Sequence, residues 1–233
     1  SNLQGTETTF DLKVVGSPVN FDLITDPIVA EQCKNGQLSA PIDCDNGTGW
    51  GNGNANANAA HLREGESQAY RLKAPGVTGT SGSIVYHYAL TKSGKVAQDF
   101  PTTFTDVAAD TIIDPTDGTA FSLPATSTLQ FPPLSTASPA IPASGSNSFS
   151  SSIPAVQAAF YAAHPTKKFA SLWGPAGTLI TGISYAFSGD ITGDSDITVT
   201  ITYTKPSATA SDMMFSMGGH ISRSTSYFPD LTA

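Results

Sequence analysis

Apolar and polar residues alternate strictly between Ile197 and Thr204, which read I-T-V-T-I-T-Y-T. Side chains on a β-strand change face at every residue, so one face of this segment is apolar and the other carries four threonines. An antiparallel sheet with one face on the core and the other in water produces this pattern. The threonine row could also suggest binding of ice or carbohydrate, but a single row is more simply a solvated face.

The same alternation recurs through most of the chain and predicts an all-β fold. Further strands are expected at 68–73, 83–91, 96–100, 120–123, 127–131, 167–173, 178–188 and 212–217. One short helix is expected near 153–164, because Pro154 suits a first helical turn and Val156 and Phe160 follow helical spacing. Residues 132–152, rich in proline and serine, predict a long surface loop. Together these elements predict an antiparallel β-sandwich, jelly-roll or immunoglobulin-like, with long loops.

Residues 1–24 read as an extended segment that precedes a single sandwich domain at 25–233. Two alternating runs in this segment are separated by the turn Gly16-Ser17-Pro18. Such a segment can enter a neighbouring subunit's sheet as a donor strand, since main-chain hydrogen bonds give affinity and alternate side chains give register. The candidate inserted residues are Phe10, Leu12, Val14, Val19, Phe21 and Leu23.

The composition favours an extracellular location. Charged residues make up 13% of the chain, about half of the roughly 25% that is typical of soluble domains, so Ser, Thr, Asn and Gly must supply solubility. The net charge is −8 with no basic cluster, which argues against nucleic-acid binding. No apolar run is long enough to span a membrane. Ser1 in first place indicates a processed N-terminus after export, although a tag-cleavage scar would look the same.

Two cysteines, Cys33 and Cys44, lie in a loop-like segment and are too few for a zinc site without nearby histidines. In an exported protein they predict a disulfide, which would stabilise the fold by about 3 kcal/mol. The sequon Asn46-Gly47-Thr48 in the same region makes Asn46 a candidate glycosylation site. Glycosylation there depends on the source organism.

No pattern of catalytic residues stands out, so we do not expect an enzyme. The four histidines are isolated, and no nucleophile elbow or H-E-x-x-H motif occurs. His87 is expected to be solvated, and the ring of His220 is expected to clamp a neighbouring turn by hydrogen bonds. Calcium is the one cofactor considered, because loop carboxylates supply its oxygen ligands. The candidates are Asp190, Asp194 and Asp196, and Asp43 and Asp45; ordinary Asx turns are the alternative, and they also explain Asp114 and Asp117.

Three motifs in order carry a resemblance to a known family. They are W-G-N-G-N-A-N-A-N-A-A-H-L-R-E-G-E-S-Q-A-Y-R-L from Trp50, T-K-S-G-K-V-A-Q-D-F at 91–100, and the stretch from Trp173 through G-D-S-D-I-T-V-T-I-T-Y-T to G-G-H-I at 218–221. Over residues 50–222 the chain resembles secreted or surface-exposed prokaryotic β-sandwich proteins, often associated with prealbumin-like modules. Such proteins usually carry His at position 96 and Trp at position 217, where this chain has Val and Met. The resemblance implies export and a structural or adhesive role, and it supplies no activity.

Two functions follow as hypotheses. The first is a self-assembling subunit of an extracellular filament, sheath or surface layer, in which residues 1–24 complete a neighbour's sheet. The second is a monomeric cell-surface adhesin that binds carbohydrate or a host protein. In that case Trp50 and Trp173 would be the exposed aromatic residues on which a sugar stacks.

Overall fold

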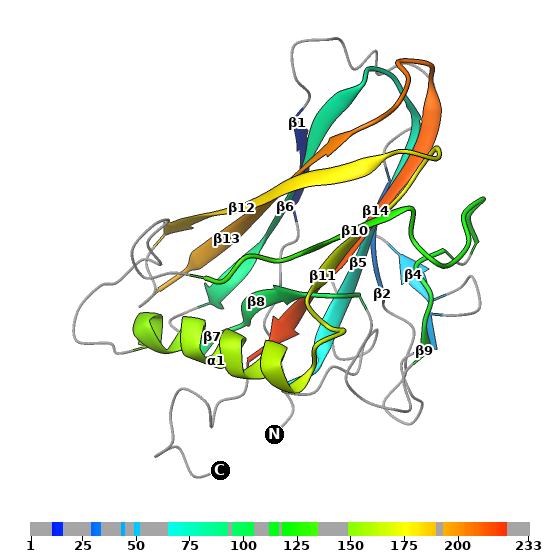
Figure 1. Ribbon diagram of the computed structural model, residues 1–233. Coiled ribbons are helices and arrows are strands. Elements are labelled where there is room, and N and C mark those ends of the chain that lie inside the picture. The colour runs from blue at the N-terminus through cyan, green and yellow to red at the C-terminus, as the bar shows by residue number, and fades with distance from the viewer. Residues whose placement is uncertain are drawn as a thin grey trace.

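The computed structural model describes residues 11–15, 29–33, 43–44, 49–51, 65–92, 95–104, 112–116, 118–134, 149–189 and 193–222. Two sheets of antiparallel strands pack against each other with a single α-helix at one end, which confirms the predicted all-β sandwich (Figure 1). The choice between a jelly-roll and an immunoglobulin-like sandwich stays a prediction. So does the domain boundary at residue 24, which lies outside the described residues.

The first sheet contains the strand with the threonine row. In spatial order it comprises β1 (Asp11–Val15), β6 (Ser81–Lys92), β13 (Ser195–Thr204) and β12 (Leu179–Gly189), and the short β7 (Lys95–Val96) also pairs with β6. Apolar residues of β13 are buried, whereas its threonines are half-buried or exposed. The outer face of this sheet is therefore the wet face that the sequence predicts.

The second sheet is built around β14 (Ser211–Ile221). Its spatial order is β10 (Ser127–Gln130), β11 (Phe169–Trp173), β14, β5 (Ser67–Val77), β2 (Val29–Cys33) and β4 (Trp50–Gly51), and β8 (Gln98–Thr102) also pairs with β14. Two further strands, β3 (Asp43–Cys44) and β9 (Ile112–Ile113), pair in parallel. The strand predicted at 96–100 is divided between the two sheets, because β7 pairs with β6 whereas β8 pairs with β14 of the second sheet.

The main core lies between the sheets, and a second cluster covers the far face of the second sheet. The main core holds Ile84, Tyr86 and Tyr88 of β6, Ile197, Val199 and Ile201 of β13, and Leu72, Phe215 and Met217 of the second sheet. The second cluster holds Cys33, Cys44, Trp50, Ala69, Phe104, Ile113, Trp173 and Met214. Because both of its faces are covered, β14 is buried over nearly its whole length instead of alternating.

Helix α1 (Phe149–Ala163) lies beside β8 at the end of the sandwich (Figure 1). Its Tyr161 hydroxyl donates to the Pro101 carbonyl at 2.6 Å, and its Gln157 carbonyl oxygen accepts from the Leu134 amide at 2.7 Å. The helix begins four residues before the predicted start, so Pro154 lies inside it rather than in its first turn. Leu134 is buried, so the predicted surface loop contributes to the core at its beginning.

Within the described ranges, no helix combines the length and the apolar character needed to cross a lipid bilayer.

Candidate functional site: a buried histidine–aspartate junction

The three motifs that carry the family resemblance meet where β5, β14 and β8 lie side by side. His220 of β14 lies opposite Ser67 of β5, and Gly218 lies opposite Thr102 of β8. The first motif therefore supplies β5, the second supplies β8, and the third supplies β14. Segments that are far apart in the sequence converge at this one place, which we call the strand junction (Ser67, Gln98, Asp99, Thr102 and His220).

His220 is the centre of the strand junction. Its Nδ1 lies 2.7 Å from Asp99 Oδ1, and the two side chains are 5% and 0% exposed. A carboxylate oxygen accepts hydrogen bonds, so Nδ1 is the donor. The imidazole ring stacks on the ring of Phe100, with 4.4 Å between the ring centroids, and makes a T-shaped contact with the ring of Phe160, with 4.7 Å between the centroids. His220 was predicted to hold a neighbouring turn by hydrogen bonds. Its partner is instead a strand residue, because Asp99 belongs to β8.

Gly218 and Gly219 allow β8 to approach β14 closely enough for this bond. A Cβ atom at position 218 would lie 2.7 Å from the main-chain oxygen of Thr103, and one at position 219 would overlap the Gln98 carboxamide. A glycine inside a strand often marks such a close approach. Close packing of β8 against β14 therefore explains why glycines occupy the two positions before His220.

Two hydrogen bonds join polar side chains around the pair. Thr102 Oγ1 donates to Ser67 Oγ at 2.8 Å, and Gln98 Nε2 donates to the Tyr70 hydroxyl at 2.6 Å. Burial raises the pKa of six core tyrosines, so their hydroxyls stay neutral; they are Tyr70, Tyr86, Tyr88, Tyr161, Tyr185 and Tyr203.

Serine, histidine and aspartate occur together here, but their arrangement favours a structural role. As whole residues, Ser67, Asp99 and His220 are each at most 4% exposed, whereas a nucleophile must be reached by its substrate. The Ser67 hydroxyl accepts from Thr102 of β8, a strand that pairs with β14 and not with β5. The strand junction is thus suited to holding three segments together.

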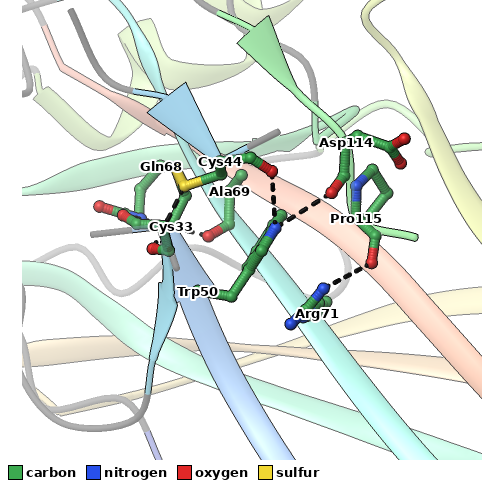
Figure 2. Close-up of a disulfide and its surroundings, with 9 residues drawn as sticks. Cys33, Cys44, Trp50, Gln68, Ala69, Arg71, Asp114 and Pro115 are labelled. Atoms are coloured by element: carbon green, nitrogen blue, oxygen red, sulfur yellow. Dashed lines mark hydrogen bonds between the residues drawn. A yellow bond between two sulfur atoms is a disulfide. The ribbon is translucent and has the colours of Figure 1, made fainter. Parts of the chain in front are cut away.

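A second polar cluster surrounds the disulfide on the far face of the second sheet (Figure 2). Cys33 and Cys44 are joined, which confirms the predicted bond. The Trp50 indole nitrogen donates to the carbonyl oxygens of Cys44 and Asp114, each at 3.0 Å. Gln68 Nε2 donates to the Cys33 carbonyl at 2.9 Å. The disulfide and Trp50 therefore fix the segments that cover this face.

Both tryptophans are buried, which contradicts the expectation of exposed aromatic residues for sugar binding. Trp50 is 7% exposed and Trp173 is 2% exposed. The Trp173 indole nitrogen donates to the Ser122 carbonyl at 3.1 Å. Because both rings are buried, neither offers a sugar an exposed face on which to stack.

Arg71 is a buried cation that the sequence reading missed. Its guanidinium carbon lies 4.6 Å from the Trp50 ring centroid, and its Nη1 donates to the Pro115 carbonyl at 2.9 Å. Its Nε lies 2.7 Å from Glu31 Oε2, which also contacts Lys73 Nζ at 2.9 Å. These contacts tie β5, β2 and the segment after β9 to one side chain.

The calcium candidates are only partly described, so calcium binding stays a prediction. Asp190 and Asp45 lie outside the described residues, Asp43 belongs to β3, and Asp194 and Asp196 lie at the start of β13. Among the residues that the structure describes, no group of three or more potential ligands gathers.

Asp114 is the turn-former that the sequence predicts. Its Oδ1 accepts from the Thr116 amide at 2.8 Å and from the Thr116 hydroxyl at 2.7 Å. Asp117 and the sequon residue Asn46 lie outside the described residues, so their assignments stay predictions.

The proposed donor segment is described only in its middle. Residues Asp11–Val15 form β1, in which Leu12 lies opposite Tyr86 and Val14 lies opposite Ile84 of β6. The other candidates, Phe10, Val19, Phe21 and Leu23, lie outside the described residues. His87 of β6, expected to be solvated, is half-buried between β1 and β13.

Comparisons of the chain with protein-family models, curated protein sequences and solved structures find no match.

Proposed function

We propose that the protein is an extracellular structural protein that assembles into a filament, sheath or surface layer, with its N-terminal segment completing a neighbour's first sheet. The observation that carries this proposal is the position of β1. This strand is added at the edge of the first sheet, where five consecutive residues pair antiparallel with β6.

Strand exchange would preserve the pairing that β1 makes. The same residues can form the same ladder with β6 of a second copy, because identical chains offer identical edges. The register places Leu12 and Val14 opposite Tyr86 and Ile84, which are both buried in the core. An exchanged strand would therefore present its apolar positions to a neighbour's core in the same order.

The disulfide and the composition support an extracellular location. Disulfides persist in oxidising compartments and are rare in the cytosol. Cys33 and Cys44 are joined and buried, and charged residues make up only 13% of the chain. A surface that relies on Ser, Thr, Asn and Gly for solubility suits an exported scaffold.

The two polar clusters support a structural role. The His220–Asp99 pair is buried, the Arg71–Glu31 pair joins a buried arginine to a half-buried glutamate, and both pairs connect strands that are distant in sequence. Side chains that would be candidates for catalysis are used in the described structure to connect elements. Such connections suit a protein whose function is to keep its shape.

Sedimentation of assembled material tests the donor contact. We expect wild-type protein to form a pelletable fraction in the ultracentrifuge, and a variant lacking residues 1–24 to remain in the supernatant. A full-length variant with Leu12→Asp and Val14→Asp should behave like the deletion, because two carboxylates would face core positions. The matched control carries Asp11→Ser and Lys13→Ser and should pellet. If the deletion variant pellets at the wild-type concentration, the donor-segment proposal is wrong.

A further inference from the structure

We infer that β12 is a second assembly surface, at which two copies of the chain pair antiparallel around a two-fold axis. This inference rests on the proposed self-assembly and adds to it a contact that does not involve the N-terminal segment. It follows from the length, composition and exposure of one edge strand.

β12 is a long edge strand without the usual protection. It forms the edge of the first sheet opposite β1, and its eleven residues, L-I-T-G-I-S-Y-A-F-S-G, include no charge and no proline. Monomeric proteins guard their edges by short strands, charges or prolines, because an open edge templates further pairing. The other described edges are shorter: β1 has five residues, two of them charged, β10 has four and β4 has two.

Within the described residues, contacts of the chain cover the beginning of β12. The Ile180 amide donates to Ser127 Oγ of β10 at 3.0 Å, so the beginning of the strand is occupied. Farther along, Ser184, Ala186 and Ser188 are exposed on the outer face. In the part of the chain that the structure describes, no strand pairs with the outer side of β12. Residues 182–189 are therefore the open stretch.

A second copy of the chain fits this stretch because the stretch is complementary to itself. When two copies pair antiparallel with Tyr185 at the two-fold axis, Ile183 lies opposite Phe187 of the second copy, and Ser184 lies opposite Ala186 of the second copy. Every pair on one face is then apolar, and every pair on the other face is small and neutral. No like charges meet, although the whole chain has a net charge of −8.

The apolar side of β12 also has surface left to bury. Ile183 and Phe187 are half-buried and pack against the edge of the main core. In the proposed register, Ile183 of one copy and Phe187 of the second copy would cover each other's exposed surface. Aromatic and β-branched side chains directly opposite each other on neighbouring strands are a favourable combination.

The charge test uses two lysine substitutions on the same face of the sheet. Ser184→Lys places a charge on the edge strand, and Thr200→Lys places one on the next strand inward, directly opposite Ser184. Both are made in the full-length chain carrying Leu12→Asp and Val14→Asp, which blocks the donor contact. Without either lysine this chain should sediment as a dimer. Ser184→Lys should raise the dimer dissociation constant at least about tenfold, because two charges per dimer would enter a neutral contact.

The control decides between pairing at the edge and stacking of the outer faces. Thr200→Lys should leave the dissociation constant within about twofold of the parent value, since Thr200 lies on β13, one strand inward of the paired edge. A monomeric parent chain, or a Thr200→Lys variant weakened as much as Ser184→Lys, would overturn the inference. Both variants should keep the fold, since Ser184 is exposed and Thr200 is half-buried on the wet face, and circular dichroism of each variant checks this.

The register is tested by a cross-link. In the proposed pairing, residue 184 of each copy lies opposite residue 186 of the other, at a distance that suits a disulfide. The double variant Ser184→Cys with Ala186→Cys should give a covalent dimer on a non-reducing gel, whereas Thr200→Cys should stay monomeric on that gel. The absence of a covalent dimer in the double variant would contradict the register.

The two proposals fail in different ways. A dimer through β12 without any pelletable polymer in the wild type would keep the inference and remove the proposed function. The reverse result has two parts: the chain whose only change is Ser184→Lys still forms polymers, and the same substitution leaves the dimer dissociation constant of the donor-blocked chain unaltered. That result would support the proposed function and contradict the inference.

Discussion

Removing the hydrogen bond between His220 and Asp99 tests whether the strand junction stabilises the fold. Asp99 is fully buried, and its Oδ1 lies 2.7 Å from His220 Nδ1. Removing the acceptor leaves a buried imidazole N–H without its hydrogen bond, and the loss of a buried hydrogen bond to a charged group costs about 1.5–3 kcal/mol. We therefore expect Asp99→Ala to lower the free energy of unfolding by about 1.5–3 kcal/mol. Asp99→Asn keeps an acceptor for the imidazole N–H, so its cost should be smaller, about 1 kcal/mol.

Urea unfolding followed by tryptophan fluorescence measures these differences, because Trp50 and Trp173 are both buried and will be exposed on unfolding. The control is Asp212→Ala, which removes an exposed carboxylate that accepts one hydrogen bond from the Gly76 amide. Its cost should stay below about 1 kcal/mol.

A double-mutant cycle with His220→Ala separates the bond from the packing of the ring. The ring also contacts Phe100 and Phe160, so the histidine variant alone mixes several losses. If the two residues act as a pair, their coupling energy should be about 1–3 kcal/mol. Losses that add to within about 0.5 kcal/mol would refute the reasoning, because they would mean that the short distance reflects no energetic coupling.

Three further predictions concern stability. Replacing Cys33 and Cys44 together by alanine should lower the free energy of unfolding by about 3 kcal/mol, because the short loop is no longer closed in the unfolded chain; urea titrations with and without reductant check this. Gly218→Ala should cost about 1–3 kcal/mol, because the methyl group meets the main-chain oxygen of Thr103. Gly182→Ala, which meets only a threonine hydroxyl, should change stability by less than about 1 kcal/mol, and equal melting temperatures for the two glycine variants would contradict this account. The six core tyrosines, whose pKa burial raises, should make the fold sensitive to alkali. Above pH 10 the unfolded chain releases their protons more readily than the folded chain, so each tyrosine lowers the free energy of unfolding by up to about 1.4 kcal/mol per pH unit. Tyrosinate absorbance should then rise together with the loss of β-sheet circular dichroism, and a rise well before that loss would count against it.

The first sheet could be predicted from the sequence because its strands β12 and β13 have one face toward the core and one more exposed face. The alternation in β13 is a local pattern, and the structure places its apolar residues in the core and its threonines on the outer face. The second sheet gives a weaker signal. Both faces of β14 are covered, so its residues read as a nearly continuous apolar run with two glycines.

The strand junction could be predicted only in part. The two glycines before His220 were a usable signal, since glycine inside a strand often indicates a close neighbour. The identity of that neighbour could not be read from the chain, because Asp99 is 121 residues away. Pairing of strands so distant in sequence depends on the whole topology.

Trp50 shows how a local reading fails. It stands in a run of glycine and asparagine, a composition typical of exposed loops, and this led to the expectation of a sugar platform. Its environment is supplied by residues from elsewhere: the disulfide, Arg71 of β5 and the Asp114 carbonyl. Burial of a loop residue by long-range contacts leaves no trace in the neighbouring sequence.

An electron micrograph of the full-length oxidised protein shows at once whether the chain assembles as proposed. We predict filaments or sheets at concentrations where the wild type pellets, and single particles or dimers for the chain lacking residues 1–24. Fields of isolated particles for the wild type across that concentration range would contradict the account.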